Sequence, residues 1–218
     1  MTSRDDRTRT DPAPAGAPPL AARYAVDLPP WVLDETAGAA LATDEEKMSL
    51  ACRLARRNVR EGTGGPFAAL VLDAATGALL SAGVNLVLSS GLSSSHAEVV
   101  ALSLAQVATG AWDLGAGGAR RELVVNWRPC VQCFGAVLWS GVTRLVIAGQ
   151  GPELERLTGF DEGPLVPDWV AQFEARGIAV VEGVLRDEAL AVFRDYGELA
   201  AEGRVTVYNA RGRGAIQR

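Results

Sequence analysis

One histidine and two cysteines in this sequence have the types and the spacing of a metal site. His96 is the only histidine among the 218 residues, and Cys130 and Cys133 follow Pro129 with two residues between them. One imidazole and two thiolates form a ligand set that zinc accepts, with a fourth position left for water. The sequence therefore predicts one Zn²⁺ per chain, held by His96, Cys130 and Cys133.

A glutamate stands beside this predicted site. Glu98 follows His96 by two residues, so its carboxylate can face the metal without binding it. Thiolates donate strongly to zinc, and the metal then acidifies its water less than it would with three histidine ligands. A nearby base compensates for that loss. We therefore predict that Glu98 is the catalytic residue and carries protons during a hydrolysis.

Other interpretations of the same residues stay open. A lone histidine can be a surface residue or a core residue, and a Cys-x-x-C pair can be redox active or part of a structural zinc site. Glu98 would have no task in a structural site, which would also prefer four protein ligands. The third cysteine, Cys52, lies on the apolar face of a predicted helix, and we expect it to be a small buried side chain.

Predicted helices and strands bring the three ligands together. The stretch 43–46 fits a capping box and begins a helix over 44–60. Two further apolar runs predict helices that begin at His96 and at Cys130. At a helix start, Cys130 and Cys133 lie on one side, where free backbone N–H groups and the helix dipole favour the thiolate. If the two helices lie side by side on a sheet, their N-termini converge on one point.

The order of the predicted elements indicates the fold class. Strands are expected at 67–72, 79–88, 123–126, 142–148 and 178–181. Helices are expected at 44–60, from 96 to about 110, from 130, and at 153–157, 169–175 and 187–196. This alternation predicts a three-layer α/β/α fold with a central five-stranded mixed sheet. We expect residues 1–30 to be a disordered or loosely packed arm, 31–199 to be the domain and 200–218 to be a tail.

Composition narrows the class of protein. Hydrophobic residues make up 48% of the chain, which allows a large core, and no apolar run approaches the length of a membrane span. The polar N-terminus does not resemble a secretory signal, so a cytoplasmic location is expected. A net charge of -5 argues against nucleic-acid binding. The arginines near the two ends, at 4, 7, 9, 211, 213 and 218, are interpreted as solubilising.

The His96 and Cys130 motifs resemble those of the cytidine deaminase-like superfamily, whose members are zinc-dependent nucleobase and nucleoside deaminases. Within it, the chain is similar to the bacterial guanine deaminase and cytosine deaminase branch. The resemblance is good over about residues 45–161 and looser in the C-terminal part. Further stretches that carry it are 65–71, 135–139, 159–161 and 207–209.

The resemblance implies hydrolytic deamination of an amino-substituted nucleobase, with guanine first, to the oxo product and ammonia. It implies a homodimer, with exchange of the C-terminal tail between subunits as an open alternative. It also implies that Asn85, eleven residues before His96, and the backbone N–H of Ala97 contact the substrate ring. Further pocket candidates are Phe67, Trp139, Asp161 and Tyr208. Phe67 and Trp139 could equally be core residues, Asp161 a solvated loop acid, and Tyr208 an anchor for the tail.

Departures from the family pattern leave the substrate open. Arg128 stands where the family usually has glutamate, Gln132 stands where it usually has methionine, and the loop 93–95 is all serine. These changes favour an alternative substrate such as cytosine, a nucleoside or an unusual aminated heterocycle of specialised metabolism. Editing of adenosine in transfer RNA and a non-catalytic zinc-stabilised domain are less favoured, the first by the acidic charge and the second by Glu98.

Overall fold

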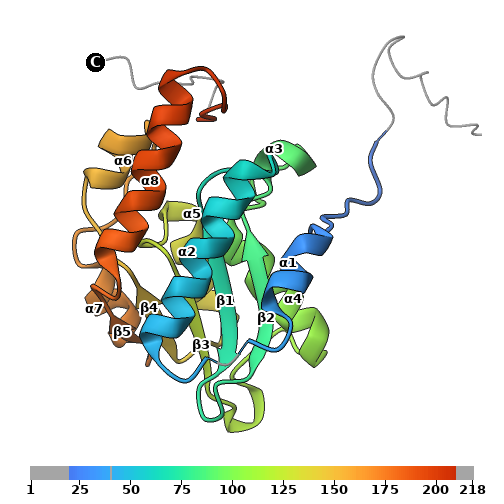
Figure 1. The fold of residues 1–218 in the computed structure, drawn as a ribbon. Helices are drawn as coiled ribbons and strands as arrows, with labels where there is room; N and C mark the ends of the chain where they lie inside the picture. Colours follow the sequence, from blue (N-terminus) through green and yellow to red (C-terminus); the bar gives the residue numbers. More distant parts are fainter. Residues whose placement is uncertain (1–19, 40, 210–218) are drawn as a thin grey trace, which may run out of the picture.

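The computed structural model describes residues 20–39 and 41–209, and Figure 1 shows their arrangement. Residues 20–29 form no helix or strand, while the rest of the predicted arm, 1–19, lies outside the described residues. No helix in the described ranges is both long and apolar enough to span a bilayer. The helical and strand elements, in chain order, are α1 (Pro30–Thr36), α2 (Asp44–Arg60), β1 (Ala68–Asp73), β2 (Leu79–Val84), α3 (Val87–Ser90), α4 (Ala97–Thr109), η1 (Ala116–Gly118), β3 (Arg121–Val125), α5 (Val131–Ser140), β4 (Arg144–Ile147), α6 (Glu153–Thr158), α7 (Trp169–Glu174), β5 (Ala179–Val181) and α8 (Arg186–Ala201).

The strands form one mixed sheet in the order β2-β1-β3-β4-β5. β1 pairs antiparallel with β2 and with β3, while β3, β4 and β5 run parallel. A parallel pair needs a crossover connection, and α5 supplies it between β3 and β4. The five-stranded mixed sheet with flanking helices confirms the predicted fold class.

Alternate residues of the central strands face two separate cores, which makes the fold three layers thick. On one face Leu70 of β1, Val124 of β3 and Val146 of β4 pack with buried residues of α2 and α8. On the other face Val71 and Val125 pack with buried residues of α4, α5 and α7. Figure 1 shows α2 and α8 side by side on the first face. α4 and α5 share the second face, and their N-termini lie at the same end of the sheet, where the N-cap residues His96 and Cys130 are close together.

The first long helix has the bounds that its sequence predicts. The Thr43 side chain accepts a hydrogen bond from the Glu46 N–H, and the Glu46 carboxylate accepts one from the Thr43 N–H, which completes the capping box. Cys52 lies on the buried side of α2 with no exposed surface, as predicted. The chain leaves the helix through Gly62, whose φ of 68° is left-handed and favours glycine.

Several elements differ from the sequence-based expectations, among them β2, α1 and α8. The second strand ends at Val84 rather than near residue 88, because the chain turns there into the short helix α3. Pro30–Thr36 forms a helix that was not predicted. The last helix continues to Ala201, beyond the expected end at residue 196.

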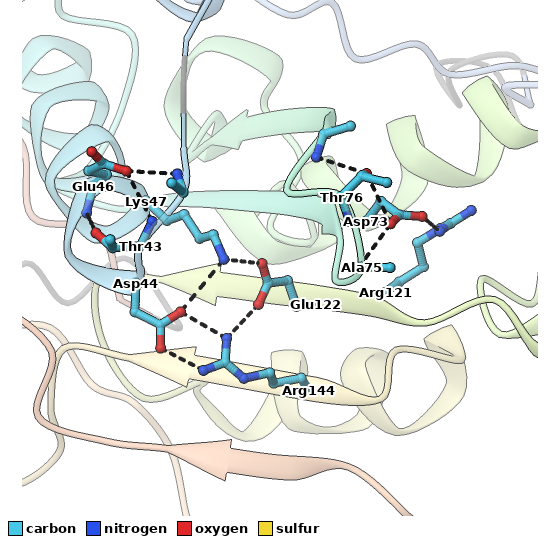
Figure 2. Close-up of polar contacts among 12 residues, drawn as sticks. Thr43, Asp44, Glu46, Lys47, Asp73, Ala75, Thr76, Arg121, Glu122 and Arg144 are labelled. Carbon is cyan, nitrogen blue, oxygen red and sulfur yellow. Dashed lines mark hydrogen bonds and ion pairs between the residues drawn. The ribbon is translucent and has the colours of Figure 1, made fainter.

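Charged side chains tie the start of α2 to the starts of β3 and β4 (Figure 2). Lys47 lies 2.6 Å from Glu122, and both are almost fully buried. Arg144 pairs with Glu122 and with Asp44, so the four charges form one network. Nearby, Asp73 pairs with Arg121 and accepts bonds within its own turn. The network lies at the N-terminal ends of β3 and β4. It therefore stabilises the end of the sheet that is opposite the predicted metal ligands.

Candidate functional site

The three predicted metal ligands meet at the N-termini of two neighbouring helices. His96 is the N-cap of α4, Cys130 is the N-cap of α5, and Cys133 lies in the first turn of α5. The Nδ1 atom of His96 lies 3.3 Å from the Sγ atom of Cys130 and 3.5 Å from that of Cys133, and all three ligand atoms are within 4.8 Å of one another. Bonds of about 2.1 and 2.3 Å to a tetrahedral zinc ion would separate such atoms by roughly 3.6 Å. The donor set and its spacing therefore fit zinc.

The two thiols divide one negative charge unequally. A hydrogen bond from Cys133, together with one from His96, lowers the pKa of Cys130 to about 4. The same contact with Cys130, followed by burial, raises the pKa of Cys133 well above its ordinary value. Without metal, the pair is thus a Cys130 thiolate that accepts a hydrogen bond from the neighbouring Cys133 thiol. The thiolate is the form that binds a metal, so Cys130 is ready for one at neutral pH.

Glu98 is buried beside the three ligands. Glu98 is only 6% exposed and lies in the first turn of α4, directly after Ala97. Burial, and then the negative charge of Cys130, raise the pKa of its carboxyl to about 7. A group that titrates near neutral pH both accepts and releases protons readily, which suits it to general acid–base work.

A cavity of about 620 Å³ opens next to these residues. His96, Glu98 and Cys130 contribute to its wall. A volume of this size is typical of sites for small molecules. Residues predicted to bind the substrate also line the cavity, and they are Phe67, Asn85, Asp161 and Tyr208.

A second hollow, of about 670 Å³, runs between α2 and α8. Its charged lining residues include Arg56 and Asp195, which pair at 3.1 Å, and Arg204 and Glu202, which also pair at 3.1 Å. None of the three metal ligands lines this hollow. We therefore assign the chemistry to the cavity beside Glu98.

The side-chain amide of Asn85 has a defined orientation. Its Oδ1 atom accepts hydrogen bonds from the backbone N–H of Val87 at 3.3 Å and of Gly65 at 3.4 Å. This network assigns the oxygen to the protein side and leaves the Nδ2 group for the cavity. Asn85 is almost completely buried, so that donor can find a partner in the cavity or at the neighbouring Tyr208 hydroxyl. An acceptor of the ligand, such as a ring nitrogen or a carbonyl oxygen, would satisfy it.

The segment after α8 closes the same cavity. Asn209 accepts a hydrogen bond from the Asp161 N–H and donates one to the Gly159 carbonyl, each at 2.9 Å. The ring of Tyr208 packs against Phe160 with 4.9 Å between the ring centroids. Its hydroxyl is buried and has no hydrogen-bond partner within residues 20–39 and 41–209. An unpartnered hydroxyl in a cavity wall is a group that a ligand could satisfy.

Trp139 does not reach this cavity in the single chain. It is 82% exposed, whereas Cys133 and Val137 of the same helix are buried. At 100° per residue, a position two residues after Val137 faces away from the sheet. Trp139 thus does not line the cavity of the single chain, and its part in binding the substrate stays a prediction. The backbone N–H of Ala97 was predicted to contact the substrate ring. Ala97 is the first residue of α4, where N–H groups lack a partner inside the helix.

Sequence reasoning missed one acidic residue of the cavity. Glu162 lines it, and burial raises the pKa of its carboxyl to about 8. Its signal in the sequence is weak, because it stands next to Asp161 in a glycine- and proline-rich loop without periodicity. The two departures from the family pattern, Arg128 and Gln132, line the same cavity. The unusual residues thus lie where a ligand would contact them.

Comparisons with known proteins agree with this geometry. The family described as the cytidine and deoxycytidylate deaminase zinc-binding region matches residues 41–149, which include all three ligands and Glu98. A curated relative, the guanine deaminase of Bacillus subtilis (strain 168), is 31% identical over 118 residues, which are 54% of this chain and 71% of the relative.

Solved structures cover more of the chain. The guanine deaminase from Nitrosomonas europaea is 42% identical, with a TM-score of 0.77 over 83% of this chain and 100% of its own. The protein NE0047 in complex with 2,6-diaminopurine is 44% identical, with a TM-score of 0.77 over 86% of this chain and 97% of its own. With the metal ligands, the buried glutamate and half of its length matched, the chain belongs to the cytidine and deoxycytidylate deaminase zinc-binding family.

Proposed function

We propose that this protein is a zinc-dependent guanine deaminase, which hydrolyses guanine to xanthine and ammonia. One observation carries the proposal: a zinc-type ligand set lies beside a buried glutamate and a small-molecule cavity, in a chain that is 42% identical to a guanine deaminase. The relative that binds 2,6-diaminopurine adds support, because this purine carries an amino group at the same ring carbon as guanine.

Proton transfers are the work of Glu98 in this proposal. When bound, zinc supplies a Lewis acid that lowers the pKa of a water and so provides a nucleophile at neutral pH. Glu98 takes the proton that the attacking water loses and delivers it to the ring nitrogen beside the attacked carbon. It then helps the amine to leave as ammonia. Burial of this carboxyl beside the metal ligands places it where the same group can accept the proton and return it.

The other cavity residues orient the base. Asn85 presents its Nδ2 group, Phe67 offers an aromatic face, and the hydroxyl of Tyr208 seeks a partner. Asp161 and Glu162 add acceptors for the amino and N–H groups of a purine. A free base of this kind is uncharged, so a cavity with these polar groups can hold it without a basic patch.

A deaminase for another aminated heterocycle is the second candidate. Its support is the presence of Arg128 and Gln132 in the cavity wall, because these side chains could contact a ligand that differs from guanine. Cytosine, a nucleoside or a heterocycle of specialised metabolism would then be the substrate. The same experiment separates the two candidates.

The decisive experiment is an ammonia-release assay with the zinc-loaded protein. Guanine should yield equimolar xanthine and ammonia, while a Glu98→Ala variant with its zinc retained should yield neither above background. The panel also includes cytosine, adenine, their nucleosides and aminated triazines. Turnover of another member without turnover of guanine would replace the first candidate by the second.

A homodimer completes the proposal. Val107 is 79%, Trp112 78% and Trp139 82% exposed, and the loop and helix that carry the two tryptophans are joined by a bond from Leu114 N–H to the Ser140 carbonyl. Exposed aromatic side chains that gather on one face are typical of an interface. Light scattering on a sizing column should give a dimer, and a Trp112→Ser, Trp139→Ser double variant should shift it to monomer. A wild-type monomer at micromolar concentration would contradict this part.

The location and the tail also remain proposals. We propose a cytoplasmic protein, because a reducing compartment keeps Cys130 and Cys133 available for metal. Fractionation of cells that carry a tagged chain tests this. We further propose that the C-terminal tail completes a cavity of this kind, either in the same chain, where Tyr208 and Asn209 line it, or in the partner after exchange in a dimer. Residues 210–218 of the tail lie outside the described residues. A crystal structure of the dimer would distinguish the two.

A further inference from the structure

Asn58 of α2 holds two parts of the cavity wall with one side chain. It is completely buried, and its Nδ2 group donates to the carbonyl of Gly65 at 2.9 Å and to the carbonyl of Asn85 at 2.8 Å. Its Oδ1 atom accepts a hydrogen bond from the hydroxyl of Thr63. The amide is therefore fully engaged, and its orientation is fixed by partners on both ends.

The two loops that it joins touch each other directly. A Cβ atom added to Gly64 would lie 1.9 Å from the carbonyl oxygen of Asn85, so no side chain fits at that position. On the other side of the loop, a Cβ atom at Gly65 would lie 2.8 Å from the hydroxyl of Tyr208. The glycine loop is thus enclosed between Asn85 and Tyr208, and a small shift of its backbone would move both.

The orientation of Asn85 depends on the same contact. Gly65 uses its carbonyl to bind Asn58 and its N–H to bind the Asn85 side-chain oxygen. Loss of the Asn58 bonds would leave the Gly65 carbonyl with only the Phe67 N–H as a partner and would free the Asn85 carbonyl, so both backbone segments could shift. The amide group that faces the cavity would then lose one of the two donors that define its direction.

We propose that Asn58 is a positioning residue, which fixes the Asn85 amide in the direction that binds the substrate ring. The inference rests on the proposed deaminase function and on Asn85 as a ring contact. Asn58 itself does not line the cavity and touches no reacting atom. A buried asparagine could instead serve stability alone. The two roles differ in one measurable respect, which is whether the effect of Asn58 on catalysis requires the Asn85 side chain.

A double-mutant cycle tests this dependence. Asn58→Ala, Asn85→Ala and the double variant are compared with the zinc-loaded wild type by kcat and KM for guanine and by melting temperature. Asn58→Ala should lower kcat/KM by roughly 10- to 100-fold when Asn85 is present. It should lower it less than about twofold when Asn85 is already alanine, because independent sites add and coupled sites do not. Its loss of melting temperature should be the same in both backgrounds.

Ser140 provides a control away from the glycine loop. It is also completely buried, its hydroxyl donates to the Val137 carbonyl and accepts a hydrogen bond from the Val142 N–H, and it does not line the cavity. The factor by which Ser140→Ala changes kcat/KM should be the same with and without the Asn85 side chain. Equal factors for Asn58→Ala in the two backgrounds would overturn the proposal and leave Asn58 a structural residue.

Two additions keep the test decisive. If Asn58→Ala does not fold, Thr63→Val removes only the hydroxyl that holds Asn58, and a smaller effect with the same dependence on Asn85 is expected. If guanine is not turned over, the cycle is run with the panel base that is, so failure of guanine does not touch the Asn58 argument. If no base reacts, crystal structures of wild type and Asn58→Ala decide: a displaced Asn85 amide supports the proposal, and an unmoved one rejects it.

Discussion

His96 and Cys130 are 34 residues apart in the chain, yet the Nδ1 atom of the one lies 3.3 Å from the Sγ atom of the other. They meet because each residue caps the N-terminus of a helix, and both helices cover the same face of the sheet. The free N–H groups at both helix starts favour negative charge, which suits a thiolate and an acid in that place. Backbone geometry thus prepares the electrostatics of the site.

Zinc binding should release about one proton from the cysteine pair at pH 7, because both sulfurs must be thiolates in the bound state. Cys130 is already deprotonated, with a pKa of about 4 set first by its bond from Cys133, while the pKa of Cys133 is raised. Calorimetric titrations in buffers of different ionisation enthalpy measure the number. A Glu98→Gln background removes any contribution of that carboxyl. Release of two protons would show that Cys130 is also a thiol without metal, or that His96, whose pKa is raised in spite of burial by its bond to Cys130, carries a second proton.

Replacement of Glu98 by glutamine should abolish proton transfer and leave the metal. The amide has the same shape but cannot accept the proton of water, and general acid–base groups typically contribute 10²- to 10⁴-fold. We expect kcat to fall by about that factor, with the zinc content by mass spectrometry unchanged. A variant that loses zinc together with activity would mean that Glu98 supports the metal site instead.

Glu162 should make the zinc-free protein less stable as the pH rises. Burial raises its pKa from the ordinary 4.5 to about 8, so the folded state binds a proton that the unfolded state releases in this range. Stability is therefore kept below about pH 4.5 and falls as the pH rises towards 8. Glu162→Gln should melt several degrees above wild type at pH 8 and close to it at pH 5. An equal difference at both pH values in differential scanning fluorimetry would contradict this assignment.

The charge network at the end of the sheet opposite the metal ligands should contribute to stability and not to catalysis. Lys47→Met leaves Glu122 buried with Arg144 as its remaining cation, so the loss of stability should be below the cost of an unpaired buried charge, about 3–5 kcal/mol, and above that of an exposed pair. Exposed pairs are worth under about 1 kcal/mol, so Arg204→Met, which breaks the exposed pair with Glu202, is the control. Urea unfolding measures both variants. The kcat of folded Lys47→Met should equal that of wild type.

Local sequence signals located some elements well and others poorly. The bounds of α2 could be predicted because Thr43 and Glu46 form a capping box at its start and Gly62 follows its end. The end of β2 could not, because the apolar run continues past Val84 although the chain turns to bring Asn85 into the cavity. The apolar run continues without a break from the strand into the turn, so the sequence does not mark where the strand ends. Tertiary packing determines that point.

Some residues of the site could also be predicted from the sequence, and others could not. The metal ligands and Glu98 could be predicted because their chemistry requires rare residue types at fixed spacing. Glu162 could not, because an acid in a loop usually faces solvent, and only the folded loop shows that it faces the cavity. Trp139 was placed through resemblance, while the helical position two residues after Val137 turns it outward.

Lys47 is the only lysine of the chain, and its ammonium group is held between Glu122 and Asp44. Reagents that acylate amines should therefore reach Lys47 only after unfolding. The appearance of a label at this one position then reports that the molecule has opened.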